Sequence, residues 1–158
     1  MDFTLQEMLL ALLPMWNYRI SKPFKQFLDG EVSLEMYYCI QTLRWCSGTL
    51  TMSELAHYTR MPKQQMTKMV NRLIELQFVK RIYDPADRRI IKIQITHKAE
   101  EYIRHFLETD AGCFQPLLQL LDTEDTEKFK KALDLLYQVL SKIPCDWNEQ
   151  KEDDSSSK

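Results

Sequence analysis

The fold of this chain is decided by residues 51–96, which read TMSELAHYTRMPKQQMTKMVNRLIELQFVKRIYDPADRRIIKIQIT. Thr51 and Glu54 have the spacing of a capping box, in which each side chain binds the backbone amide of the other residue. A short helix begins there, and residues 59–61 form a turn. Pro62 suits the first position of a second helix, because the N–H that proline lacks has no partner there. The sequence therefore predicts two helices joined by a tight turn.

The second of these helices has two distinct faces. Apolar side chains recur every three and four residues and predict one buried stripe, which consists of Met66, Met69, Val70, Leu73 and Ile74. The opposite face carries Gln64, Gln65, Lys68, Asn71 and Arg72. Glutamine and asparagine can pair with adenine through two hydrogen bonds, whereas lysine and arginine can reach guanine or phosphate. This inventory suits base reading, although an ordinary surface helix with a solvated polar face is the alternative.

Two strands with alternating side chains are expected directly after the second helix. The first covers residues 79–83, and the second covers residues 91–95, where isoleucines alternate with Lys92 and Gln94. Asp84, followed by proline, starts a turn between them. The expected fold class is therefore mainly α with a small β-hairpin as a wing.

The tip of this hairpin presents Arg88 and Arg89. The minor groove of A·T-rich DNA is narrow and strongly negative, and it attracts a guanidinium group. Asp87 is close enough in sequence to orient one of the two guanidinium groups, and a solvated turn residue is the alternative. A polar helix followed at once by a hairpin with a basic tip can contact two adjacent grooves of a DNA duplex.

Positive charge is concentrated in this part of the chain. The formal net charge of the whole chain is −2, so composition alone would not indicate a nucleic-acid partner. Residues 60–98, however, carry 10 basic and 3 acidic side chains, a net charge of +7. The net charge is −2 over residues 1–59 and −7 over residues 99–158. The basic segment thus supplies the charge that neutralises phosphates, and the acidic remainder keeps other faces off DNA.

Together these segments resemble the winged helix-turn-helix of the MarR family of bacterial transcriptional regulators. The resemblance is carried by residues 50–56, 61–73, 79–81 and 84–96. Its most specific piece is the Asp-Pro-x-Asp-Arg-Arg sequence of the hairpin, followed by alternating apolar residues and a threonine. The length and the helical flanks also fit, so the resemblance covers the chain up to about Asn148.

The resemblance implies roles for individual residues. Arg89 is the wing residue that enters the minor groove, and Asp87 is its acidic partner. The positions of the second helix that contact DNA are occupied by Gln64, Gln65, Thr67, Lys68 and Asn71. Gln77 is a departure, because the family usually has a glycine at the end of this helix, where a left-handed conformation is often needed. Either Gln77 adopts that conformation or the helix ends differently.

Helical segments flank this central region. The 158 residues, of which 44% are hydrophobic, fit one compact domain or two small lobes. We expect a single MarR-like unit over residues 1–147, in which residues 33–96 form the winged helix-turn-helix. Residues 1–30 and 97–147 are expected to form a helical dimerisation region. The polar, serine-rich tail over residues 148–158 is expected to be disordered.

Prolines and glycines predict where the flanking helices are interrupted. Pro14 and Pro23 should bend or interrupt the first segment. A helix over residues 33–46 should follow, with Leu34, Tyr37, Tyr38, Ile40 and Leu43 available for burial. Thr96 can cap a long helix that begins near His97, and Gly112 and Pro116 predict a kink in that helix. A last helix is expected over residues 124–143.

The apolar stripes of the flanking helices are larger than the small central region can cover. The economical interpretation is a two-fold homodimer in which the first and last helices of each chain interlock, as the resemblance also implies. A symmetric dimer can place one reading helix in each of two successive major grooves, because palindromic half-sites lie about 34–36 Å apart. The alternative is that these stripes form only an intramolecular core.

A small aromatic or anionic effector is a further expected partner. By resemblance, such molecules bind between the dimer helices and the DNA-reading region and alter the spacing of the two reading regions. Aromatic walls with a few polar groups suit an organic ligand. The candidate lining consists of Trp16, Tyr18, Phe24, Tyr37, Tyr38 and Arg44. The alternative is that these aromatic side chains are plain core.

Other functional classes lack their sequence signatures. The chain has no Gly-rich phosphate loop, no His-Glu-x-x-His helix and no nucleophile elbow, so we expect neither an enzyme nor a cofactor. The three histidines lack the spacing of metal ligands, and the four cysteines include no Cys-x-x-Cys pair, although redox sensing through Cys39 or Cys46 stays open. No apolar run reaches the roughly 20 residues that span a bilayer, and the start lacks the basic leader of a signal peptide. We therefore expect a cytoplasmic protein with no membrane partner.

The sequence as a whole predicts a dimeric regulator of transcription that binds a palindromic operator in double-stranded DNA. Repression is the default outcome, because a dimer bound over a promoter blocks polymerase by occupancy. One alternative is a winged-helix module that contacts another protein and has no DNA affinity. Another is a DNA-binding regulator that has no ligand.

Overall fold

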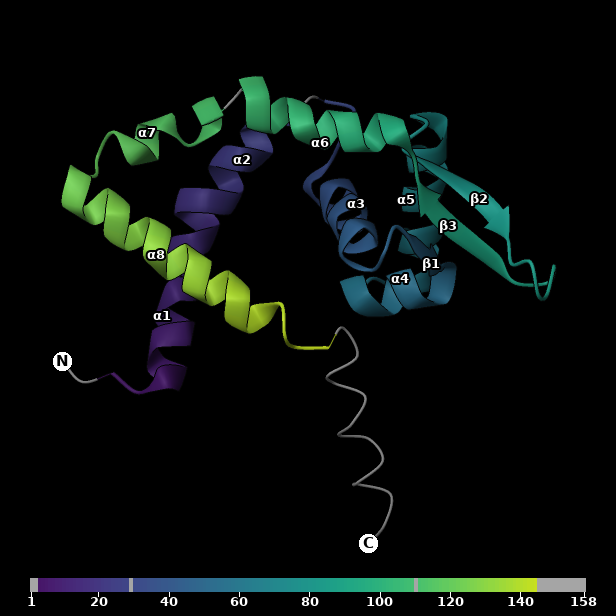
Figure 1. Cartoon of the computed structure of the whole chain (residues 1–158), viewed down its shortest axis with the longest axis horizontal. Helices are drawn as coiled ribbons and strands as arrows, with labels where there is room; N and C mark the ends of the chain where they lie inside the picture. Colours follow the sequence, from purple (N-terminus) through teal and green to yellow (C-terminus); the bar gives the residue numbers. More distant parts are fainter. Residues whose placement is uncertain (1–2, 29, 110, 145–158) are drawn as a thin grey trace, which may run out of the picture. The chain divides into compact units, whose positions relative to one another are not determined.

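The structure is a computed structural model, and it describes residues 3–28, 30–109 and 111–144. The chain divides into two compact units, residues 1–117 and residues 118–158. The tail predicted to be disordered, residues 148–158, lies outside the described residues. The first unit combines helices with a three-stranded antiparallel sheet, which confirms the predicted fold class (Figure 1).

The elements follow one another in the predicted order. The helices of the first unit are α1 (Leu5–Trp16), α2 (Lys22–Phe27), α3 (Leu34–Trp45), α4 (Met52–Thr59), α5 (Lys63–Glu75) and α6 (His97–Thr109). Its strands are β1 (Thr49–Thr51), β2 (Val79–Tyr83) and β3 (Ile91–Ile95). A short helix, α7 (Gln115–Leu118), lies at the boundary of the two units, and α8 (Thr123–Leu140) belongs to the second.

The predicted capping box begins α4. The Thr51 hydroxyl accepts a hydrogen bond from the Glu54 amide over 3.1 Å, and the Glu54 carboxylate accepts one from the Thr51 amide over 2.7 Å. Arg60 ends α4 in the left-handed conformation, with a φ of 52°. Pro62 lies one residue earlier than predicted, because it occupies the N-cap of α5 and Lys63 is the first helical residue. The two helices and their turn are otherwise confirmed.

The two strands of the predicted hairpin have the predicted ends, and Val79 pairs with Ile95 while Tyr83 pairs with Ile91. The sequence did not predict β1, which pairs with β3 on the side opposite β2 and puts Leu50 beside Ile93. Three residues are too few to show an alternating pattern, so only the distant pairing with β3 defines this strand. The hairpin loop between β2 and β3 extends beyond the helices of the first unit (Figure 1).

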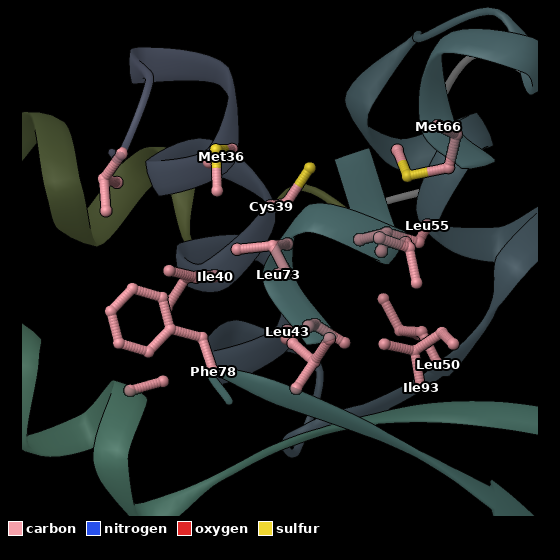
Figure 2. Packing of buried hydrophobic residues seen from close by; sticks show 14 of the residues in the cluster. Met36, Cys39, Ile40, Leu43, Leu50, Leu55, Met66, Leu73, Phe78 and Ile93 are labelled. Atoms are coloured by element: carbon pink, nitrogen blue, oxygen red, sulfur yellow. The ribbon is translucent and has the colours of Figure 1, made fainter. Parts of the chain in front are cut away.

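An apolar core joins the sheet to α3, α4, α5 and α6 (Figure 2). Its fully buried side chains come from α3, α4, α5 and the sheet, and they include Ile40, Leu43, Leu55, Met66, Val70, Leu73 and Ile93. The stripe predicted for α5 is confirmed, since Met66, Val70 and Leu73 are buried and Met69 and Ile74 are half-buried. This packing fixes the opposite face of α5 toward solvent.

The face that α3 buries differs in part from the prediction. Ile40 and Leu43 are buried as expected, together with Met36 and Cys39, which were not expected there. Tyr38 is 47% exposed, and Leu34 and Tyr37 are only half-buried. The buried positions follow one helical stripe at spacings of three and four residues, whereas Tyr38 lies off that stripe. Tyr38 is therefore the one predicted residue that is exposed, since Leu34 and Tyr37 pack against the core.

Gln77 adopts the left-handed conformation, with a φ of 63°. The helix therefore ends as the family pattern requires, but without the glycine that usually permits this conformation. Thr96 supports the end of α5, because its hydroxyl donates to the Gln77 carbonyl over 2.6 Å. The same hydroxyl accepts a bond from the Ala99 amide over 3.3 Å and so caps α6 as predicted. One side chain thus joins the end of α5 to the start of α6.

Thr96→Val is expected to destabilise the fold by about 0.5–2 kcal/mol, since it removes the N-cap of α6, whereas water can replace the lost donor at the exposed Gln77 carbonyl. Urea unfolding followed by circular dichroism measures the change. Thr67→Val is the matched control, because the exposed Thr67 hydroxyl donates only to Lys63 O within the same helix. Equal urea midpoints for Thr96→Val and Thr67→Val would show that the two hydrogen bonds of the Thr96 hydroxyl do not stabilise the fold.

The flanking segments are interrupted more strongly than predicted. Pro14 lies inside α1, but a π-helical segment, Asn17–Ser21, separates α1 from α2, which has Pro23 in its first turn. The prediction of one kinked helix after the wing is wrong, because α6 ends at Thr109 and a 3₁₀ turn, Ala111–Cys113, precedes α7. Gly112 lies in that turn and Pro116 is the second residue of α7, so α6 ends before the chain reaches either residue.

The second unit is represented by α8, which begins one residue before the predicted start and ends three residues before the predicted end. Its N-cap is Asp122, whose carboxylate accepts a bond from the Asp125 amide over 2.7 Å. Glu124 and Asp125 lie in its first turn, where negative charge stabilises a helix. Its C-terminal half leaves several large apolar side chains exposed, namely Leu135, Leu136, Tyr137, Val139 and Leu140.

Candidate nucleic-acid interface

The outward face of α5 carries the side chains predicted to read DNA. Because Met66, Val70 and Leu73 are buried, the residues between them point to solvent. All five positions taken from the family resemblance are exposed, namely Gln64, Gln65, Thr67, Lys68 and Asn71. The Thr67 hydroxyl donates to the Lys63 carbonyl over 3.0 Å, so its proton is used within the helix. The face as a whole offers two glutamine amides, a lysine and an asparagine to a partner.

Arg72 is exposed at the edge of this face, but its charge is already matched. Its guanidinium lies 2.9 Å from the Glu75 carboxylate and 3.8 Å from the Glu31 carboxylate. Two neighbouring acids reduce the attraction of this arginine for phosphate. Among the predicted residues of α5, Arg72 is therefore the one least available to a negatively charged partner.

Asp84 organises the turn of the wing. Its carboxylate accepts bonds from the Ala86 amide over 2.8 Å and from the Asp87 amide over 3.4 Å. The same carboxylate lies 2.8 Å from the Lys92 ammonium group on β3. The hydrogen bond from Lys92 is the largest cause that lowers the pKa of Asp84, and the same contact raises the pKa of Lys92. The Asp84 carboxylate therefore stays ionised to lower pH than usual, and the Lys92 ammonium group stays protonated to higher pH than usual.

The tip of the wing holds Arg89 away from the rest of the chain. The Arg89 side chain is 93% exposed. The Asp87 carboxylate accepts one bond from the Arg89 amide over 3.0 Å and another from Arg89 Nε over 3.3 Å. Of the two interpretations of Asp87, the orienting one is therefore supported. Arg88 is also exposed, so two guanidinium groups project from the tip.

Asp84→Asn is expected to loosen the wing without unfolding the core, since the turn lies outside that core. A lowered pKa means that the Asp84 carboxylate stabilises the folded wing above its unfolded pKa and that this contribution is lost as the pH falls through the folded value. The amides of Ala86 and Asp87 should exchange hydrogen faster in Asp84→Asn at pH 7, and this difference from the unsubstituted protein should shrink as the pH falls through the lowered pKa of Asp84. Unchanged exchange at pH 7 would contradict this role of Asp84.

A hydrogen bond joins the wing to the outward face of α5. Arg81 Nη2, on β2, donates to Asn71 Oδ1 over 2.8 Å. Arg81 is not among the predicted site residues, because no local sequence pattern places it beside Asn71. A shallow groove of about 330 Å³ lies next to this contact and is lined by Ile74, Gln77, Val79, Lys80, Arg81 and Thr96. This hydrogen bond thus connects the wing directly to the exposed face of α5.

The predicted effector residues are brought together only in part. The ring of Phe24 lies 4.6 Å from that of Tyr37, and Phe24 also packs near Phe106 and Phe114. Tyr38 lies beside Tyr37, whereas Trp16 and Tyr18 are exposed on the first helical segment. Some of these aromatic side chains belong to the core and others are exposed. The first group fits the interpretation as plain core, and the second group stays available to a ligand.

Arg44 is connected to the same aromatic cluster through polar side chains. Its guanidinium lies 2.9 Å from the Glu100 carboxylate and donates to Gln41 Oε1 over 3.1 Å. Gln41 in turn donates to the Tyr37 hydroxyl over 2.6 Å. Arg44 therefore joins α3 to the first turn of α6, and a ligand carboxylate at this arginine would compete with Glu100.

Cys39 is fully buried, and burial raises the pKa of its thiol to about 12. The thiolate is the reactive form of cysteine, so Cys39 is poorly suited to redox sensing near neutral pH. Cys46 is half-buried. Within the described residues, no three histidine, cysteine, aspartate or glutamate side chains group into a metal site. None of the described helices combines the length and the apolar character needed to cross a membrane.

Comparison with known sequences points to one family. Residues 47–90 match a model described as the MarR family. Two uncharacterized HTH-type transcriptional regulators of Bacillus subtilis (strain 168) are similar to part of the chain. YpoP is 29% identical over 96 residues, which cover 61% of this chain and 67% of YpoP. YhbI is 33% identical over 85 residues, which cover 54% of this chain and 55% of YhbI.

Solved structures share the fold at low sequence identity. A mutant of MarR from E. coli is 19% identical and has a TM-score of 0.68, with 86% of this chain and 98% of that chain covered. The same mutant in complex with operator DNA has a TM-score of 0.57 over 81% of this chain and 92% of that chain. The organohalide-sensing regulator RdhR, bound to 2,4-dichlorophenol, is 16% identical and has a TM-score of 0.56 over 89% of this chain and 83% of that chain. These likenesses establish the fold alone.

Proposed function

Because the chain is a member of the MarR family by its helix-turn-helix and wing, we propose that it is a transcriptional repressor that binds a palindromic DNA operator as a homodimer. The observation that carries the proposal is the surface formed by the outward face of α5 and the wing. On this surface Asn71 and Arg81 touch, and Arg89 projects from the tip.

The proposed reading mode assigns one groove to each element. The side chains of α5 reach base edges in the major groove, which is wide enough to admit a helix. Arg89 enters the adjacent minor groove, oriented by Asp87. Lys68 and Arg88 are exposed and contribute positive charge toward phosphates. The operator complex of the E. coli MarR mutant supports this mode by analogy of fold.

The proposed dimer rests on the exposed apolar surface of α1. None of its residues is buried in the single chain. Eight of its large apolar side chains are at least 44% exposed, namely Leu5, Met8, Leu9, Leu10, Leu12, Leu13, Met15 and Trp16. A helix that is apolar on all sides is stable only when its surroundings are apolar as well. A second copy supplies such surroundings, and its two-fold axis matches the symmetry of a palindrome.

We propose in addition that a small aromatic or anionic effector releases the operator. Tyr37, Tyr38 and Arg44 are the residues proposed to receive it, because Gln41 links the Arg44 guanidinium to Tyr37 and the Tyr38 ring lies beside that of Tyr37. The ligand of RdhR, 2,4-dichlorophenol, supports a phenolic effector by analogy. Bound ligand would favour a separation of the two reading regions that does not match the operator. As a DNA-bound regulator, the protein would act in the cytoplasm.

The DNA-binding part of the proposal is tested by fluorescence anisotropy at increasing salt concentration, with genomic duplexes as probes. An interface with 6–10 phosphate contacts should lose roughly 10³–10⁵ in affinity between 50 and 200 mM salt. A protein that binds another protein but no duplex at low salt would support the interaction module instead. The effector part is tested separately by titrating phenols and aromatic carboxylates into the operator complex. Failure of all of them to release DNA would refute the effector but not DNA binding.

A further inference from the structure

The contact between Arg81 and Asn71 determines how the asparagine amide is oriented. Arg81 Nη2 donates to Asn71 Oδ1 over 2.8 Å, between β2 and the exposed face of α5. An arginine side chain carries only hydrogen-bond donors. The amide oxygen of Asn71 must therefore face the guanidinium, and the amide nitrogen must face away from it.

This orientation conflicts with the pairing that asparagine usually makes with adenine. That pairing uses the amide oxygen to accept from adenine N6 and the amide nitrogen to donate to adenine N7. Here the oxygen already accepts a hydrogen bond from a cation, and such bonds are roughly twice as strong as bonds between neutral groups. The bound cation also makes the second lone pair of the oxygen a weaker acceptor. Asn71 therefore offers DNA chiefly the two N–H bonds of its amide group.

A side chain that only donates selects for bases with acceptors in the major groove. Guanine presents N7 and O6 there, and thymine presents O4. Adenine instead presents the N6 amino group beside N7, so an opposing Asn71 amino group would leave donors facing each other. Guanine and thymine are therefore the bases that suit Asn71 in this orientation, and adenine is disfavoured.

The surroundings of Arg81 leave the contact with Asn71 intact. In the described part of the chain, no carboxylate lies within ion-pair distance of Arg81, whereas Arg72 has Glu75 at 2.9 Å. An acidic neighbour would compete with the neutral amide for the guanidinium. Because such a neighbour is absent, the Arg81 guanidinium stays hydrogen-bonded to Asn71. The charge of Arg81 adds to the positive charge of the surface formed by α5 and the wing.

We propose that Arg81 is a specificity-determining residue that acts through Asn71. By holding the amide oxygen, Arg81 turns Asn71 into a donor that prefers guanine or thymine over adenine at the contacted position. The inference rests on the proposed function, because it assumes that α5 reads base edges in DNA.

The test measures affinities of the full chain for four duplexes that differ only at the base pair contacted by Asn71. That base pair is identified as the operator position at which Asn71→Ala abolishes discrimination. The unsubstituted protein should prefer guanine or thymine over adenine there by about tenfold. Arg81→Met, which keeps an apolar stem but no donor, should shift this ratio toward adenine by about tenfold or more. Lys80→Met is the matched control and should weaken all four duplexes by the same factor.

Asn71→Asp provides a second, independent variant, because Arg81 stays in place and the carboxylate offers no donor to DNA. This variant should lose the preference for guanine or thymine. The inference is overturned if the unsubstituted protein prefers adenine, if Arg81→Met weakens all four duplexes equally, or if Asn71→Ala changes the preference at no position. If the unsubstituted protein binds no duplex at low salt, the proposed function itself is refuted. This result differs from an equal loss of affinity of Arg81→Met for all four duplexes, which would refute the inference alone.

Discussion

Arg89→Ala should reduce operator affinity about thirtyfold or more, because a lost groove contact costs about 1–3 kcal/mol and a symmetric dimer loses it twice. The Arg89 side chain is 93% exposed and, among the described residues, bonds to Asp87 of its own turn, so its removal should leave the fold unchanged. Fluorescence anisotropy with an operator duplex measures the loss. Thermal unfolding of the same sample should show no change in midpoint.

Arg104→Ala is the matched control for this substitution. Arg104 is an arginine on α6 whose side chain is 55% exposed, and it pairs with Glu101 over 3.3 Å. It lies outside the surface formed by α5 and the wing. The control should therefore retain most of the affinity. Equal losses for the two variants would show that Arg89 acts only through the net charge of the protein.

Leu9→Glu should convert the dimer into a monomer. Leu9 lies in the middle of α1 and is 54% exposed in the single chain. In the proposed dimer this position becomes buried, and two unpaired carboxylates would then cost about 3 kcal/mol or more, which raises the dimer dissociation constant at least about a hundredfold. Sedimentation equilibrium measures this constant directly. Operator affinity should fall in parallel, because a monomer contacts only one half-site.

Trp45→Glu is the control for the charge itself, because Trp45 is 70% exposed at the end of α3, outside the helices expected to form the dimer. This variant should remain a dimer and bind DNA with nearly unchanged affinity. If Leu9→Glu also remains a dimer, the exposed apolar surface of α1 does not form the interface. A monomer in which Leu9→Glu retains full operator affinity would separate DNA binding from dimerisation.

The helix-turn-helix and the wing could be predicted from sequence because their signals are local. The capping box at Thr51 and the alternation in residues 91–95 each lie within a few neighbouring residues. The strand β1 was missed, because its three residues pair with β3, which lies some forty residues further along the chain. The side of α3 that is buried was also predicted in part incorrectly, since the packing of Met36 and Cys39 depends on distant elements.

The candidate site, too, could be predicted from the sequence only where its signals are local. The exposed positions of α5 follow from its helical period, and the pairing of Asp87 with Arg89 follows from the turn. The partners of Arg72 and Arg81 do not follow from any local pattern. Glu31 lies before α3, and Asn71 and Arg81 are ten residues apart on different elements. Gln77 also illustrates the limit, because its left-handed conformation is supported by Thr96, nineteen residues away.

Selection of bound duplexes from a random library tests the central claim most directly, because the recovered sequences report helix, wing and dimer together. If a symmetric dimer reads the operator, we expect an enriched palindrome whose half-site centres lie about 10–10.5 base pairs apart, or a multiple of that spacing. We also expect A·T-rich sequence where Arg89 meets the minor groove. Recovery of no enriched sequence at low salt, or of an asymmetric site bound by one chain, would contradict the proposal that a symmetric dimer binds a palindromic operator.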